Sequence, residues 1–211
     1  EVDTAQAEWE TALPEWKVLV PETFTAQAGT TLELLEDNSI LASGENPDKE
    51  TYEITTLLTD SNLTAMRLEG LTHDSLPHKG AGRSGNSNVV LTEFEVEIAG
   101  ADQPGSWQPI TFTRAWADHE QRDGDFQIGN AIDSDLATGW STDGQKKREN
   151  RQAVFLAETP FGHAEGSRLR IRLKHQSQQA QHQFGRVRLA VTLSAAYAEK
   201  EIPLKLQDWY S

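Results

Sequence analysis

A recurrent alternation of apolar and polar residues in short runs is the feature that most constrains this chain, because period-two alternation predicts β-strands. In residues 89–98, Val90, Phe94, Val96 and Ile98 fall on one face, while glutamates fall on the other. Helical periodicity is scarce, and turn-forming residues separate the runs. The sequence therefore predicts an all-β fold, an antiparallel β-sandwich of the jelly-roll kind, with further strands over residues 32–35, 52–58, 63–70, 110–117, 153–157, 168–174 and 187–193.

The two ends of the chain lack this pattern. Residues 1–14 and 195–211 carry Ala, Glu, Gln and Lys without sustained alternation. We expect an N-terminal tail and a C-terminal tail or linker, which leaves one β-sandwich module over residues 15–194. Because the chain begins at Glu1 without an initiator methionine, we also expect it to be an excised part of a longer protein.

Charge and cysteine content exclude several classes of function. The chain has 19 Lys and Arg against 33 Asp and Glu, a formal net charge of −14, which repels phosphate backbones, so nucleic-acid binding is not expected. It has no cysteine, which excludes thiol nucleophiles, thiolate zinc sites and disulfides. No run approaches the roughly 18 consecutive apolar residues of a membrane helix, so no membrane span is expected.

Oxygen-bearing side chains are densest in the stretch IGNAIDSDLATGWST, residues 128–142. Asp133, Asp135 and Thr138 fall within six positions, just before Trp140. Calcium takes about six to eight oxygen ligands and accepts backbone carbonyls, so one tight loop can supply most of a site. The alternative is a metal-free turn, since Asp and Ser side chains favour turns by bonding their own backbone.

This stretch resembles the signature loop of the galactose-binding-like, discoidin-type β-sandwiches, a group that includes many carbohydrate-binding modules. That loop reads approximately A-x-D-G-D-x-x-T-x-W. Ser134 stands where the family usually has glycine. The positions that match are Ala131, Asp133, Asp135, Thr138 and Trp140.

A second motif of the same family lies earlier in the chain. The family closes with a strand of the form L-x-E-F/L-x-V, whose glutamate reaches the same calcium, and LTEFEV in residues 91–96 resembles it. Here this strand precedes the Asp loop by about 40 residues instead of ending the domain. The resemblance therefore implies a circular permutant, which is plausible for a sandwich whose termini lie close together.

A closer resemblance covers about residues 15–194 and is to the module found beside cytochrome c-like domains in large exported proteins of planctomycetes and their relatives. It is carried by LTAMRLEGL, LPHKGAGRSGNSNVVLTEFEV, the Asp loop and HQFGRVRLAVT. This resemblance implies an exported location, periplasmic or extracellular, and other domains of the parent chain as partners. The sandwich class implies carbohydrate, a polysaccharide or oligosaccharide, as the ligand.

The resemblance also implies a calcium ligand set, residue by residue. Asp133 and Thr138 would bind through their side chains, Asn130 and Asp135 mainly through their carbonyls, and Glu93 from the neighbouring strand. Trp140 would then be a core residue and not a sugar platform.

A glycine-rich stretch, residues 77–88, is the predicted ligand loop. Its three glycines allow backbone amides to turn inward, and Arg and Asn side chains offer donors to hydroxyls, carboxylates or sulfates. A histidine or an exposed tryptophan would supply the apolar face that a sugar ring prefers. The alternative is an ordinary long loop in which Arg83 is held in a structural ion pair. The predicted ligand-binding residues are His78, Arg83, Asn86, Asn88 and Trp107.

Basic residues alternate with apolar ones in residues 168–174 and again in residues 186–188. If these two runs pair with each other, the arginines form a patch suited to an acidic or sulfated glycan. The interpretation that we favour is cross-strand pairing with acidic rows such as Glu93, Glu95 and Glu97.

Signals of catalysis are weak. The six histidines include no HExxH, no G-x-S-x-G elbow occurs, and Asp123-Gly124-Asp125 lacks the later residues of an EF-hand. Glu93 with Asp133 has the composition of a glycosidase pair, but calcium would occupy the same oxygens. We therefore expect a non-catalytic carbohydrate-binding module with a structural calcium ion, and as the alternative a structural or protein-interaction domain.

Overall fold

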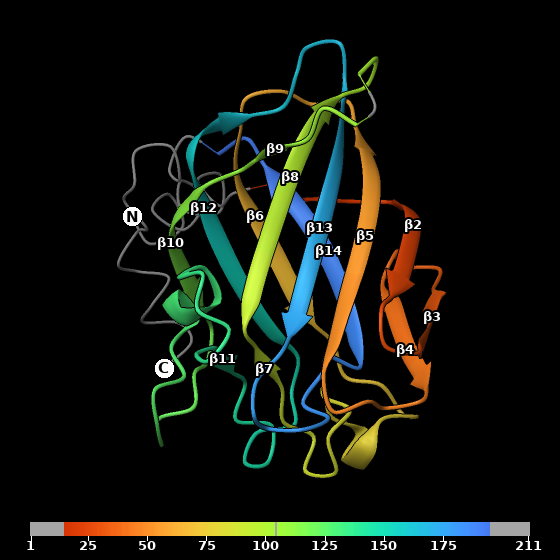
Figure 1. The fold of residues 1–211 in the computed structure, drawn as a ribbon, viewed down its shortest axis with the longest axis vertical. Helices are drawn as coiled ribbons and strands as arrows, with labels where there is room; N and C mark the ends of the chain where they lie inside the picture. Colours follow the sequence, from red (N-terminus) through yellow and green to blue (C-terminus); the bar gives the residue numbers. More distant parts are fainter. Residues whose placement is uncertain (1–14, 104, 195–211) are drawn as a thin grey trace, which may run out of the picture.

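The computed structural model describes residues 15–103 and 105–194, so both predicted tails lie outside the described residues. Two antiparallel β-sheets pack face to face (Figure 1), which confirms the predicted all-β sandwich. Within the described residues, no helix has the length and apolar character needed to cross a membrane.

The larger sheet consists of β1 (Lys17–Val18), β3 (Thr30–Leu34), β4 (Ile40–Gly44), β6 (Leu63–Gly70), β10 (Phe112–Ala117), β12 (Arg151–Phe161) and β14 (Arg186–Thr192). Their order is β10-β12-β6-β14-β4-β3, with β1 paired to β14. The smaller sheet consists of β2 (Pro21–Ala26), β5 (Glu50–Leu58), β13 (Ser167–His175), β8 (Glu93–Gly100) and β9 (Gln108–Pro109), in the order β2-β5-β13-β8-β9. A short separate pair joins β7 (Val90–Leu91) to β11 (Trp140–Ser141), and two 3-10 turns are η1 (Pro77–Lys79) and η2 (Ile128–Ala131).

The inward faces of the two sheets form the core. Phe94 of β8 stacks on Phe155 of β12 with ring centroids 4.0 Å apart, which joins one sheet to the other. At the end of the sandwich near η1, the Tyr52 hydroxyl donates a hydrogen bond to the Phe184 carbonyl at 2.9 Å. Trp140 is fully buried among these residues, as the family resemblance implies.

The two basic runs lie in different sheets, because β13 pairs with β5 and β8 whereas β14 pairs with β1, β4 and β6. The arginine patch that required these runs to pair with each other is therefore not formed. On β13, Arg170 lies 2.6 Å from Glu97 of β8, and Arg172 lies 2.8 Å from Glu53 of β5. Cross-strand pairing with acidic rows is the arrangement observed.

Candidate calcium site and adjoining cleft

The Asp loop folds through its own side chains. Asp133 Oδ1 accepts the backbone N–H of Asp135 at 2.8 Å, and Asp135 Oδ1 accepts that of Ala137 at 2.9 Å. Ser134 between them has φ +67°, the left-handed region that favours glycine. The loop therefore forms two successive Asx turns, and these direct its oxygen atoms toward Thr138.

Three acceptor oxygens surround the single hydroxyl of Thr138. Its Oγ1 lies 2.8 Å from Asp133 Oδ2, 2.9 Å from the Asp135 carbonyl and 3.5 Å from the Asn130 carbonyl. A hydroxyl carries one proton, so it satisfies one of these acceptors at a time. A cation among these four oxygens would satisfy all of them.

Glu93, the first residue of β8, completes this group from a distant part of the chain. The residue is 5% exposed, and its Oε1 is buried without a hydrogen-bond partner. Burial raises the pKa of Glu93 to about 7; a backbone hydrogen bond from Ser134 opposes this shift, and the charge of Asp133 adds to it. A buried carboxylate oxygen without a donor is costly, and a bound cation would remove that cost.

The donor set fits calcium. Two carboxylates, one hydroxyl and two carbonyls are hard oxygen ligands, and the structure brings together all five predicted ligand residues. No cluster of three or more His, Cys, Asp or Glu side chains suited to a metal ion occurs in the described part of the chain. The candidate site therefore depends on neutral oxygens as much as on carboxylates, which calcium accepts.

Arg83, the main predicted ligand residue, is used inside the fold. It is buried, its Nη1 donates to Thr30 Oγ1 at 2.7 Å, and its Nη2 lies 2.7–3.1 Å from the carbonyls of residues 43–45. These bonds tie the glycine-rich loop to β3 and β4. The geometry favours the structural alternative for this residue, although its partners are neutral groups and not an ion pair.

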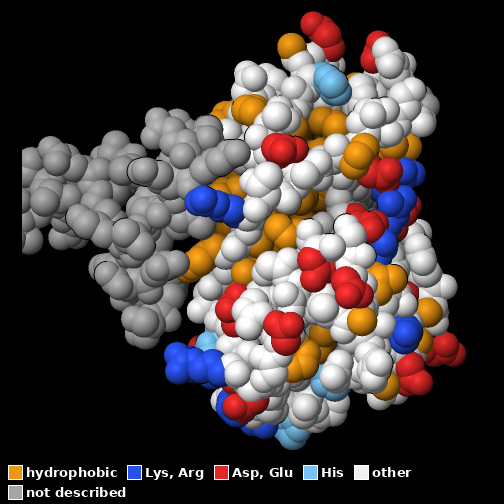
Figure 2. Space-filling model, turned by 60° about the vertical axis from the view of Figure 1, so that its left-hand side comes forward, with side chains coloured by type: hydrophobic (Ala, Val, Ile, Leu, Met, Phe, Trp, Pro, Cys, Tyr) orange, Lys and Arg blue, Asp and Glu red, His pale blue; other side chains and the backbone are white. Residues whose placement is uncertain are grey.

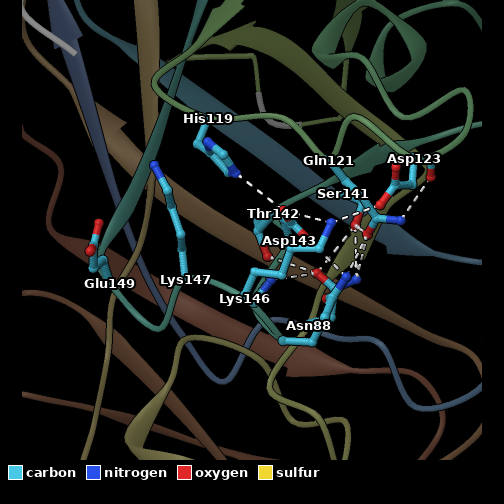
Figure 3. Close-up of polar contacts among 12 residues, drawn as sticks. Asn88, His119, Gln121, Asp123, Ser141, Thr142, Asp143, Lys146, Lys147 and Glu149 are labelled. Carbon is cyan, nitrogen blue, oxygen red and sulfur yellow. Dashed lines mark hydrogen bonds and ion pairs between the residues drawn. The ribbon is translucent and has the colours of Figure 1, made fainter. Parts of the chain in front are cut away.

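Asn88 is also engaged within the fold. It is buried, its Nδ2 donates to Gln121 and Ser141, and its Oδ1 accepts from Ser141, Thr142 and Gly144 (Figure 3). These contacts join the glycine-rich loop to Gln121, to β11 and to the residues directly after β11.

The other predicted ligand residues are more accessible but dispersed. His78 and Asn86 are exposed, and His78 Nε2 contacts the Gly85 carbonyl at 3.1 Å. Trp107 is half-buried under the Arg170 guanidinium, 4.3 Å from the ring centroid, just before β9. In Figure 1, β9 lies at the upper end of the sandwich and the loop of residues 77–88 at the lower end. The structure therefore does not bring Trp107 together with the glycine-rich loop.

A cleft of about 880 Å³ lies beside β10, at a place where the sequence predicted no site. Its apolar lining comes from residues 115–117 and Ile128, and its polar lining from residues 118–122, Gln127 and Lys147. This volume lies in the usual range for small-molecule sites. The only local signal in the sequence was the density of titratable groups in the stretch DHEQRD directly after a predicted strand.

A buried polar network holds the inner wall of this cleft. Gln121 Oε1 accepts hydrogen bonds from Asn88, Ser141 and Gln145, and His119 Nε2 lies 3.5 Å from Asp143 Oδ2 (Figure 3). Burial and the positive charges of Arg151 and Lys147 lower the pKa of His119, while Asp143 opposes this shift. His119 is therefore neutral at neutral pH, and the wall is fixed by many mutual contacts.

The cleft and the candidate calcium site share the 3-10 turn η2, the short green helical turn at the left of Figure 1. Ile128 at its start lines the cleft, and its N–H donates to Glu120 Oε1 at 2.7 Å. The carbonyl of Asn130, two residues later, faces Thr138 in the Asp loop.

Comparison of the chain with family models, with curated proteins and with solved structures finds no match in any of the three.

Proposed function

We propose that this domain is a non-catalytic carbohydrate-binding module with one structural calcium ion. The proposal includes the galactose-binding-like identity of the sandwich, its circular permutation, and its place beside other domains of an exported protein. The observation that carries it is the convergence of Glu93, Asn130, Asp133, Asp135 and Thr138, with an unpartnered buried oxygen on Glu93. The family resemblance implied this set from two motifs that lie about 40 residues apart.

We place the carbohydrate site in the cleft beside β10. Sugars need an apolar surface for the ring together with amides or charged groups for the hydroxyls. The cleft offers the half-buried Trp116 for the first role, and Gln127, an exposed amide, for the second. Arg83 and Asn88 are less suited, because their polar groups are engaged within the fold.

A glycan array probed with the chain in excess calcium tests this proposal, and isothermal titration would follow on the glycans that bind. We expect binding that is weakened when Gln127→Ala removes an exposed amide from the cleft, while Trp107→Ala at the other end leaves it unchanged. Thermal unfolding of both variants separates lost binding from lost folding.

Two other outcomes would contradict the proposal. If the folded chain binds no glycan on the array, the structural or protein-interaction domain becomes the better explanation. If bound oligosaccharides are cleaved during the titration, the domain is an enzyme.

A further inference from the structure

We propose that the cleft beside β10 takes an acidic glycan, one that carries carboxylate or sulfate groups, and that Arg122 and Lys147 contact those charges. This inference rests on the proposed function, because it names the substrate class of the same site. The distribution of paired and unpaired charges around the cleft supports it.

Two basic side chains of the cleft lack a partner. Among residues 15–103 and 105–194, no hydrogen bond or ion pair engages the Arg122 guanidinium or the Lys147 ammonium. Of the neighbouring cations, Lys146 lies 2.7 Å from Asp123 and Arg151 lies 3.9 Å from Asp118, while Arg148 is exposed and does not line the cleft. In a chain with a net charge of −14, acidic partners are abundant, so two unpaired cations in one cleft indicate a site for an external anion.

The carboxylates of the cleft are held by the protein itself. Asp118 Oδ1 accepts the N–H of Gln152 at 3.1 Å, and Glu120 Oε1 accepts the N–H of Ile128 at 2.7 Å. These contacts hold both groups toward the backbone of neighbouring segments. The charges available to a ligand are then chiefly those of Arg122 and Lys147.

Basic side chains lie near His119 together with the carboxylates of Asp118 and Asp143. Figure 3 shows the Lys147 side chain extending on the same side as the His119 imidazole, and Arg151 is buried nearby. Figure 2 shows acidic side chains scattered over the face of the molecule drawn there, while Lys and Arg side chains concentrate at its edges. An anion in the cleft would be attracted by Arg122 and Lys147, the two lining cations whose charges no described carboxylate engages.

Matched pairs of polysaccharides test the inference. The probes are polygalacturonate beside its methyl ester, and sulfated galactan beside the desulfated polymer, each titrated into the calcium-loaded chain. We expect the charged member of at least one pair to bind roughly tenfold or more tightly, because hydrogen bonds to charged groups are the strong ones. Added salt should weaken this preference.

Three variants locate the charge recognition. Arg122→Gln and Lys147→Gln should each reduce binding of the charged polymer by roughly tenfold while leaving binding of its neutral partner unchanged. Arg148→Gln removes the same charge from an exposed residue that does not line the cleft, and it should have little effect.

The remaining outcomes separate this inference from the proposed function. If neutral and charged members bind alike, or if Arg148→Gln weakens binding as much as Lys147→Gln does, the inference is wrong and the carbohydrate-binding proposal stands. If neither these polymers nor any glycan on the array binds, both proposals are wrong.

Discussion

The carboxyl group of Glu93 on β8 lies within electrostatic range of that of Asp133, although about 40 residues separate them in the chain. Two carboxylates this close repel each other, and one oxygen of Glu93 is buried without a donor. Such an arrangement is unfavourable unless a proton or a cation compensates it.

Removal of calcium should lower the melting temperature. A ligand that binds only the native state stabilises it by about 2.7 kcal/mol at a hundredfold excess over Kd, which is roughly 5 to 10 °C for a domain of this size. Scanning calorimetry with calcium and with a chelator measures the difference. Glu93→Ala should abolish it, whereas Asp123→Ala should retain it, because Asp123 is exposed and paired with Lys146. An identical melting temperature with calcium and with the chelator would contradict the calcium proposal.

Ser134→Gly should stabilise the protein by up to about 1 kcal/mol. Ser134 has φ +67°, a backbone conformation that costs a residue with a Cβ about 1–2 kcal/mol. Glycine avoids this cost but loses more backbone entropy on folding, so only part of the roughly 1–2 kcal/mol is recovered. Chemical denaturation measures the change. Ser106→Gly is the matched control, because Ser106 is exposed and is not among the residues with positive φ, so this variant should lose stability or leave it unchanged. A loss for both variants would show that Ser134 is not strained.

The strands were largely predictable, since period-two alternation marks residues that face the core on one side only. β4 was not predicted, because three successive buried residues, Ile40 to Ala42, interrupt the alternation. β2 was not predicted either, because it begins with proline and carries few apolar side chains. The run over residues 89–98 is divided at Thr92 into β7 and β8. Alternation also placed Glu93 in an exposed acidic row, whereas the structure buries it near the Asp loop.

The grouping of loop oxygens around Thr138 was predictable because these donors lie within one short loop, whereas the approach of Glu93 was implied only by the family resemblance. The cleft was not, because its lining comes from three separated segments that only the packed sandwich brings together. The glycine-rich loop was predicted to bind a ligand because glycines allow backbone amides to turn toward one. Gly82 shows a different cause, since a Cβ there would lie 2.3 Å from the Asn88 carbonyl oxygen, so glycine lets the loop pack on itself.

Arg83→Ala should destabilise the fold by about 2–4 kcal/mol. The change removes the Arg83 donor from the carbonyls of residues 43 and 44 and from the Thr30 hydroxyl oxygen, and a buried acceptor left without a donor costs about 1–3 kcal/mol unless water reaches it. Urea denaturation measures this loss. Asn86→Ala on the exposed part of the same loop removes the acceptor of hydrogen bonds from Ser84 Oγ and the Asn88 N–H, so it should cost less, about 1 kcal/mol. If Arg83→Ala keeps full stability but loses glycan binding, the original ligand role of Arg83 is correct.

Stability should fall with pH below about 6.5 because of His175. This residue is buried against Tyr52 and Phe184, and burial lowers its pKa to about 3, so the folded state favours the neutral ring. Because the folded-state pKa lies below the unfolded value near 6.5, the stability contributed by His175 is fully present above about pH 6.5 and is lost as the pH falls toward 3. The loss should reach about 2 kcal/mol by pH 5. Comparing unfolding free energies at pH 7 and pH 5 in excess calcium tests this. His175→Gln should remove that part of the pH dependence, whereas His163→Gln, at an exposed position, should keep it.

Glycan binding should depend on calcium, because η2 belongs to both sites. The Asn130 carbonyl faces the candidate calcium site, and Ile128 in the same turn lines the cleft. Without the ion, the acceptors around Thr138 are left with a single donor, and we expect the Asp loop and η2 to loosen and the cleft wall to lose its fixed shape. Titrations of the best glycan with and without a chelator, at a temperature where both forms are folded, should show about tenfold weaker binding without calcium, a coupling of about 1.4 kcal/mol.

Asp133→Asn should show the weaker binding at all calcium concentrations. Equal glycan affinity in both conditions, together with a calcium-dependent melt, would show that the ion stabilises the loop without any influence on the cleft.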